Sequence, residues 1–156
     1  MKKWLISYMI FFCFATVSLA QQKEEIHWKT FPALEDALKE KQKPVFIFFY
    51  ADWCAYCKKI KRWVFTNAQV IEKLNTEYYA VMMDAESKES IAFDGKTFSN
   101  EQAKTQRNGI HEIPLLLASR NDIPFSLPAT VILTEDFEVK KRVFEYYTSE
   151  EILEML

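Results

Sequence analysis

Two cysteines separated by two residues are the side chains of this sequence with the clearest capacity for chemistry. They form the motif Cys54-Ala55-Tyr56-Cys57. A pair at this spacing can alternate between a dithiol and a disulfide, with a thiolate as the attacking species. A disulfide across two intervening residues closes a very short loop and removes little entropy from the unfolded chain, so it is a poor structural staple. The spacing therefore predicts redox chemistry at this pair.

The elements on either side of the pair place its first cysteine at the start of a helix. The continuous apolar run Pro44–Tyr50 is typical of a strand buried on both faces of a sheet, and a helix is expected from Cys54 to about Phe65. Unpaired backbone N–H groups and the positive end of the helix dipole favour a thiolate at that position. We therefore expect Cys54 to attack and Cys57, one helical turn further on, to resolve the mixed disulfide.

Metal binding is the first alternative for the pair. A closed zinc site needs four ligands, and only His27 and His111 could complete the set, with no motif behind them. A c-type haem motif needs His after the second Cys, where Lys58 stands. We expect no metal and no other cofactor. His111 could also form a proton-transfer pair with Glu112, although a lone His is more often a packing residue.

The N-terminus has the three parts of a secretory signal peptide. Lys2 and Lys3 precede an uncharged apolar run from Trp4 to Leu19, and Ser18-Leu19-Ala20 places small residues where signal peptidase reads. We expect residues 1–20 to be a cleaved signal peptide and residues 21–156 to form one domain. An uncleaved membrane anchor is the alternative, although the run of 16 residues is shorter than the roughly 20 that a spanning helix needs.

The composition of the processed chain bounds its partners. Loss of Lys2 and Lys3 leaves 18 basic against 22 acidic residues, and without a basic stripe nucleic acid is not an expected partner. Cys13 leaves with the signal, so only the pair remains of three cysteines. An exported protein meets an oxidising compartment, where the pair forms a disulfide unless something reduces it.

The remaining pattern alternates strands and helices. Strands are expected over residues 26–30, 44–50, 78–83, 129–133 and 139–147. Helices are expected over residues 31–41 and 54–65, after Asn67, from Ser99 through about Ser119, and after Thr148. The order predicts an α/β fold, a three-layer sandwich with a mixed central sheet that ends in an antiparallel hairpin.

The region between the third strand and that final hairpin is less regular. Asp94-Gly95, between two apolar segments, indicates a β-hairpin turn. Ser99 and Gln102 form the pattern of a capping box, and Gly109 and Pro114 should kink or split the helix that follows.

Several segments together resemble the thioredoxin superfamily. They are Tyr50-Ala51-Asp52-Trp53-Cys54, Cys57-Lys58, Asn67-Ala68-Gln69-Val70, Asp84-Ala85-Glu86 and the β-β-α ending over residues 128–156. The chain is most similar to exported thioredoxin-like proteins of the Bacteroidetes type and to the C-terminal thioredoxin domain of the periplasmic thiol:disulfide interchange reductase. The resemblance covers most of residues 26–156 and implies a thioredoxin-like fold.

The resemblance also implies a site and partners. Pro128 matches the cis-proline of the family, so the backbone at Leu127 would pair with an extended substrate strand, while Trp53 and Tyr56 would rim the site. We expect a periplasmic monomer that acts on protein thiols or disulfides and exchanges electrons with a membrane or periplasmic donor. The alternative is a thioredoxin-fold binding module in which the disulfide is mainly structural and residues 85–118 grip a partner.

The sequence departs from thioredoxin in two places. Phe48 stands where thioredoxin has a buried carboxylate, so a different route must take the proton from Cys57. The dipeptide between the cysteines is Ala-Tyr, without the His that an oxidant usually carries there. This difference favours a reductant or isomerase over an oxidant.

Overall fold

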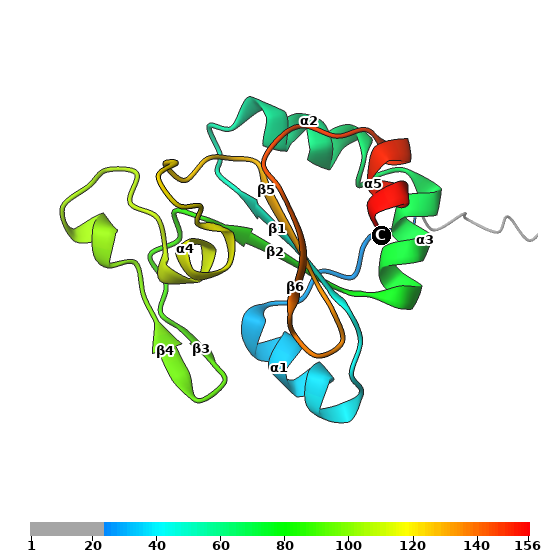
Figure 1. The fold of residues 1–156 in the computed structure, drawn as a ribbon, viewed down its shortest axis with the longest axis horizontal. Helices are drawn as coiled ribbons and strands as arrows, with labels where there is room; N and C mark the ends of the chain where they lie inside the picture. Colours follow the sequence, from blue (N-terminus) through cyan, green and yellow to red (C-terminus); the bar gives the residue numbers. More distant parts are fainter. Residues whose placement is uncertain (1–23) are drawn as a thin grey trace, which may run out of the picture.

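The computed structural model describes residues 24–156 (Figure 1). The expected signal peptide, residues 1–20, lies outside the described residues. Within residues 24–156, no helix has both the length and the apolar character needed to cross a membrane.

A four-stranded mixed sheet in the order β2-β1-β5-β6 forms the middle layer of the fold. Strand β1 (Val45–Tyr50) pairs in parallel with β2 (Tyr79–Asp84) and antiparallel with β5 (Ala129–Leu133). Strand β6 (Val139–Val143) adds antiparallel to β5 and is shorter than expected. The first five residues of β1 are all buried, as the continuous apolar run predicted for a central strand.

Helices cover both faces of this sheet, which confirms the predicted three-layer α/β sandwich (Figure 1). On one face, Phe46 and Phe48 of β1 pack with helices α2 (Ala55–Trp63), α3 (Ala68–Glu77) and α5 (Ser149–Met155). On the other face, Ile47 and Phe49 pack with helices α1 (Phe31–Glu40) and α4 (Glu112–Ala118). The alternation of side chains along a strand thus gives the domain two cores.

The caps of α3 and α5 are those predicted from the sequence. The Asn67 side chain accepts hydrogen bonds from the backbone N–H groups of Gln69 and Val70. Thr148 and Glu151 form both halves of a capping box at the start of α5. These caps fix where two of the three helices on the Phe46–Phe48 face of the sheet begin.

One prediction about elements is wrong, and another is confirmed. The strand expected over residues 26–30 is reduced to a single parallel bridge between Lys29 and Val81, because the next residue, Thr30, already caps α1. The helix expected from Ser99 through about Ser119, with a kink or split at Gly109 and Pro114, is indeed split: it consists of a 3₁₀ helix, η1 (Glu101–Lys104), a loop that contains Gly109, and α4.

Asn100 and Gly109 explain why that helix is split. The Asn100 side chain caps η1 through the N–H of Ala103 and also donates to the carbonyl of Gly109, which folds the chain back on itself. A Cβ at Gly109 would lie 2.4 Å from the backbone nitrogen of Ala103, so only Gly permits this approach. Pro114 lies in the first turn of α4, where a missing N–H is tolerated.

The segment between β2 and η1 forms a separate two-stranded hairpin. Its strands are β3 (Ile91–Phe93) and β4 (Lys96–Phe98), joined at Asp94-Gly95 as predicted. Both turn residues have positive φ angles, 51° and 68°, which is the conformation that a tight hairpin turn requires.

Candidate active site

The Cys pair lies where β1 passes into α2. Cys54 is the N-cap of α2 and Cys57 lies in its first turn, and their sulfur atoms form a disulfide with 5.2 Å between the Cα atoms. Cys54 is 3% exposed and Cys57 is fully buried. The residue expected to attack, Cys54, is therefore the less buried of the two.

The helix start supplies hydrogen-bond donors and positive charge to the sulfur of Cys54. The backbone N–H of Cys57 donates to Sγ of Cys54 over 3.1 Å, and no acidic residue lies in the first turn of α2. In the reduced protein the same donor and the helix dipole would stabilise a thiolate at Cys54.

The basic residues of α2 lie along aromatic rings beside the pair. The ammonium of Lys59 lies 4.2 Å from the centroid of Tyr146, and that of Lys61 lies 4.1 Å from the centroid of Tyr50. Cation–π contacts of this kind hold these two ammonium groups in place.

The peptide bond between Leu127 and Pro128 is cis, which confirms the prediction made from the resemblance. Ala129, the next residue, pairs with Phe49 near the C-terminal end of β1. Pro128 therefore lies at the same end of the sheet from which the chain leaves β1 and continues to Cys54. Leu127 packs against the cores on both faces of the sheet. The cis-proline and the Cys pair therefore share one end of the sheet.

Two exposed aromatic side chains are sequence neighbours of the cysteines. Trp53 is 61% exposed and its indole N–H donates a 2.8 Å hydrogen bond to Oε1 of Glu86. Tyr56 is 60% exposed, and its ring centroid lies 6.3 Å from that of Tyr146. Glu86 and Tyr146 are neighbours of the site that residue spacing did not predict, because only the fold brings them to it.

Beneath helix α2, Phe48 is fully buried in the apolar core and packs against aromatic rings. Its centroid lies 4.9 Å from that of Phe65, edge to face. Thr130 lies opposite Phe48 in the register between β1 and β5, and its hydroxyl forms a buried 2.9 Å hydrogen bond with the hydroxyl of Tyr147. Burial raises the pKa of Tyr147 well above its ordinary value, so this pair stays neutral.

His111 is a packing and capping residue. It is fully buried, its Nδ1 accepts a hydrogen bond from the N–H of Ile113 at the start of α4, and its Nε2 lies 3.1 Å from the carbonyl oxygen of Glu89. The Glu112 carboxylate accepts instead from the N–H of Ser99. Burial lowers the pKa of His111 and keeps the ring neutral. His111 and Glu112 are thus each engaged elsewhere, which favours the packing interpretation of His111 over the alternative of a proton-transfer pair.

His27 also lies away from any ligand set. It is exposed, and its backbone N–H donates to the side chain of Asn75. Across residues 24–156, the His, Cys, Asp and Glu side chains form no group of three or more with the geometry to hold a metal ion.

The strand–helix position of the Cys pair, the cis-proline beside it and the mixed sheet with helices on both faces define a thioredoxin-like domain. The chain belongs to this family: the model of the thioredoxin-like domain matches residues 31–122. The match includes the Cys pair, α1 to α4 and the β3–β4 hairpin.

Among known proteins, the chain is 39% identical over 59 residues to the thiol:disulfide interchange protein DsbD of Citrobacter koseri. The match covers 35% of this chain and only 10% of the length of that relative. The remaining nine tenths of that relative's chain has no counterpart in this alignment.

Solved structures show the same fold. A putative disulphide-isomerase from Bacteroides thetaiotaomicron superposes with a TM-score of 0.56 and 18% identity, covering 85% of this chain and 91% of that one. The C-terminal domain of DsbD from Neisseria meningitidis, in the oxidised form, superposes with a TM-score of 0.52 and 20% identity, covering 80% and 87%. At sequence identities of 18% and 20%, this likeness shows a shared fold and nothing more.

Proposed function

We propose that this chain is an exported thiol–disulfide oxidoreductase that acts on protein disulfides in the periplasm, as a reductant or isomerase. The observation that carries the proposal is the Cys54–Cys57 disulfide at the start of α2, at the same end of the sheet as the cis bond between Leu127 and Pro128. The similarity to proteins named for thiol:disulfide interchange supports the same reaction class.

The exchange would proceed in two displacements. The Cys54 thiolate attacks one sulfur of a substrate disulfide, forms a mixed disulfide and releases the other sulfur as a thiolate. Cys57 then loses its proton and attacks Sγ of Cys54, which releases the second substrate sulfur. Two electrons pass to the substrate, and the chain is left with the disulfide seen in the structure, which a separate thiol donor must reduce again.

The surface around the pair suits an extended polypeptide. An incoming strand would lie along the backbone of Leu127, next to the cis-proline, and its side chains would contact the exposed rings of Trp53 and Tyr56. Backbone pairing recognises the extended conformation whatever the sequence, so this geometry favours unfolded or misbridged proteins as substrates.

Catalysed reduction of insulin by dithiothreitol tests the proposed reaction. The wild-type chain should accelerate the appearance of insulin turbidity, and the Cys54→Ser variant should not. Turnover no faster than dithiothreitol alone would instead support a binding module with a structural disulfide. An equilibrium titration of the Cys pair against glutathione then separates the directions, because a reductant has the lower reduction potential.

Export is part of the proposal and has its own test. The intact mass of the protein from a periplasmic extract should lack residues 1–20, since Lys2, Lys3 and the small residues near Ala20 form a signal peptide pattern. A mass that still includes these residues would mean an anchored protein.

A further inference from the structure

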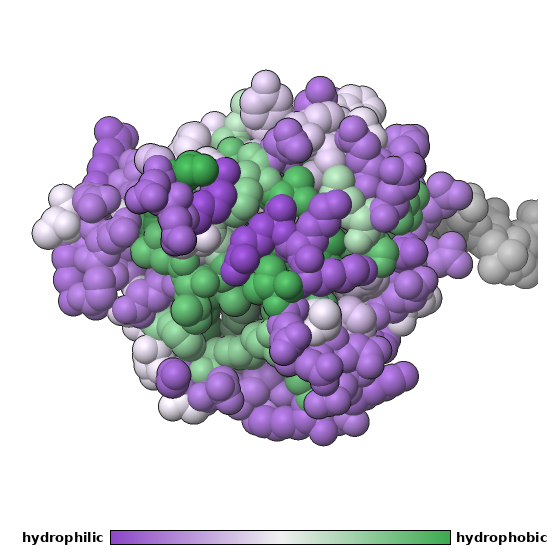
Figure 2. All heavy atoms as spheres, in the orientation of Figure 1, coloured by the Kyte–Doolittle hydropathy of each residue, from purple (hydrophilic) through white to green (hydrophobic). Residues whose placement is uncertain are grey.

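At the end of the sheet away from the Cys pair, the surface is hollowed. The hollow has a volume of about 470 Å³ and is lined by α1, the tip of the β3–β4 hairpin and the loop between β5 and β6. Figure 2 shows hydrophobic side chains gathered in a depression above α1, ringed by hydrophilic ones. Hollows of this volume are within the range that binds small molecules or side chains in proteins.

The floor of the hollow is apolar and aromatic. Leu38 of α1, Phe93 of the hairpin and Phe137 of the β5–β6 loop line it. The rings of Phe93 and Phe137 stack with 5.6 Å between centroids, and Phe31 packs edge to face on Phe93 from below. The floor therefore offers aromatic surface against which a flat group can stack.

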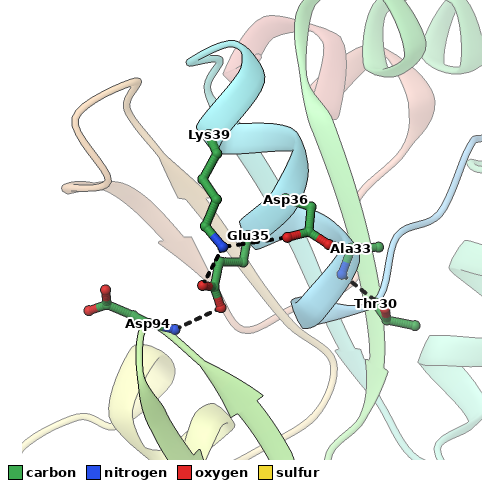
Figure 3. A network of polar contacts seen from close by, with 6 residues as sticks. All are labelled: Thr30, Ala33, Glu35, Asp36, Lys39 and Asp94. Carbon is green, nitrogen blue, oxygen red and sulfur yellow. Dashed lines mark hydrogen bonds and ion pairs between the residues drawn. The ribbon is translucent and has the colours of Figure 1, made fainter.

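The rim of the hollow is acidic. Four carboxylates surround it, those of Glu35, Asp94, Glu135 and Asp136, against the single ammonium of Lys39. That ammonium already forms ion pairs with two carboxylates of α1, at 2.9 Å from Glu35 and 3.5 Å from Asp36 (Figure 3). Among residues 24–156, no cation lies within ion-pair distance of the carboxylates of Asp94, Glu135 or Asp136. The rim thus has negative charge to offer to a ligand.

The walls are held in place by hydrogen bonds. The backbone N–H of Asp94 donates to Oε2 of Glu35 over 3.0 Å, which fastens the hairpin tip to α1 (Figure 3). In the facing loop, the N–H of Phe137 donates to the carbonyl of Thr134, and the N–H of Thr134 donates to the carbonyl of Glu138. A preformed hollow of this kind binds with less loss of conformational entropy.

We propose that this hollow binds an arginine side chain of a partner protein, carried on a segment with apolar neighbours. A guanidinium is planar, stacks on aromatic rings and donates to carboxylates in pairs, so it matches both the floor and the rim. Its alkyl stem can lie along the apolar surface beside Leu38 while the charged head reaches the carboxylates. A purely apolar ligand would match the floor and not the rim. An anionic ligand would be repelled by the carboxylates of the rim.

The location separates this binding from the redox step. Leu133, which precedes the β5–β6 loop, pairs with Val45 at the first residue of β1, whereas Cys54 follows the last residue of that strand. A partner seated in the hollow would leave the Cys pair open, so it would stay bound while the cysteines exchange. The proposal stands independently of the redox function.

A titration followed by nuclear magnetic resonance tests the proposal. The probe is an acetylated, amidated pentapeptide, Ala-Leu-Arg-Leu-Ala, added to the ¹⁵N-labelled protein at low salt. We expect saturable shifts of the amides of residues 93–95 and 135–137. The same peptide with citrulline in place of Arg should bind roughly tenfold more weakly, because the guanidinium charge is lost.

Matched variants locate the site. The double variant Glu135→Gln, Asp136→Asn should weaken binding of the Arg peptide roughly tenfold, and Glu150→Gln, Glu154→Gln on α5 should leave it unchanged. All four residues are exposed, so the variants should keep the native spectrum. The Cys54→Ser, Cys57→Ser variant should bind like the wild type, which separates this proposal from the redox one.

Three outcomes would overturn the assignment. Equal affinity for the Arg and citrulline peptides would remove the role of charge. Equal affinity for a Lys peptide would remove the role of the planar group. Shifts at the hollow that depend on protein concentration without any peptide would make a second copy of this chain the occupant.

Discussion

The ring of Phe48 stands edge to face against the ring of Phe65, with 4.9 Å between the two centroids. Phe48 belongs to the central strand and Phe65 follows the redox helix, so this contact supports α2 from below. An aromatic ring accepts no proton, and the role left to Phe48 is packing.

Truncation of Phe48 should therefore change stability without changing chemistry. We expect Phe48→Ala to lower the free energy of unfolding by about 3–5 kcal/mol, as for other buried Phe residues, in a urea titration. Phe48→Leu fills most of the space and should keep the rate of insulin reduction per folded molecule within roughly twofold. A well-folded Leu variant with a much larger loss of turnover would show that the ring contributes to the reaction.

The two cysteines should differ in reactivity. Brief treatment of the reduced protein with iodoacetamide near neutral pH should label Cys54 before Cys57, because Cys54 caps the helix and Cys57 is fully buried. Peptide mass analysis reads the order. Cys57→Ser should accumulate mixed disulfides with substrate proteins and Cys54→Ser should accumulate few. Earlier labelling of Cys57 would reverse the assigned roles.

The hydrogen bond between Trp53 and Glu86 should affect substrate binding. Glu86→Ala frees the indole, so we expect the KM for a protein disulfide to rise roughly threefold to tenfold, the equivalent of one hydrogen bond, while kcat stays nearly constant. Glu86→Gln keeps an acceptor and should restore most of the affinity. Glu89→Ala, in the same loop, is the matched control. An unchanged KM in Glu86→Ala would show that the indole needs no support.

Stability should depend on pH through His111. Burial lowers the pKa of His111, although its contact with the Glu89 carbonyl and the nearby Glu112 carboxylate oppose the shift. The unfolded chain therefore takes up a proton at a higher pH than the folded chain. This contribution is complete above an ordinary His pKa of about 6.5 and is lost as the pH falls below it, by at most about 1.4 kcal/mol per pH unit.

His111→Asn isolates this contribution, because Asn caps helices and does not titrate. Between pH 7 and pH 5, the free energy of unfolding measured in urea should decline less steeply in His111→Asn than in the wild type. His27→Asn, at an exposed position, should retain the wild-type slope. Equal slopes in His111→Asn and the wild type would contradict the assignment.

The face of the sheet that carries the Cys pair was predictable because its sequence signals are local. The buried run of β1, the Asn67 cap and the Thr148–Glu151 capping box each lie within a few consecutive residues, and each formed as expected. The position of Cys54 at a helix start follows from the same local pattern. Local signals of this kind need no knowledge of the fold.

Other features depend on contacts between distant segments. The Asn100 side chain reaches the carbonyl of Gly109, and this contact overrides the capping pattern at Ser99. Glu86 and Tyr147 meet Trp53 and Thr130 only after the sheet has formed. The hollow needs three segments that are remote in sequence. Such contacts could not be predicted from residue spacing.

Strand β6 has a consequence for crowded solutions. It forms an edge of the sheet, and its residues from Val139 to Arg142 are exposed, including the consecutive cations Lys140, Lys141 and Arg142. Two molecules that met edge to edge at β6 would lie with their strand backbones about 4.8 Å apart and would place like charges of both molecules on each face of the joined sheet. Repulsion between these like charges opposes growth of the sheet from one molecule to the next, and added salt weakens the repulsion. The edge that completes the domain thus also guards it against amyloid-like stacking.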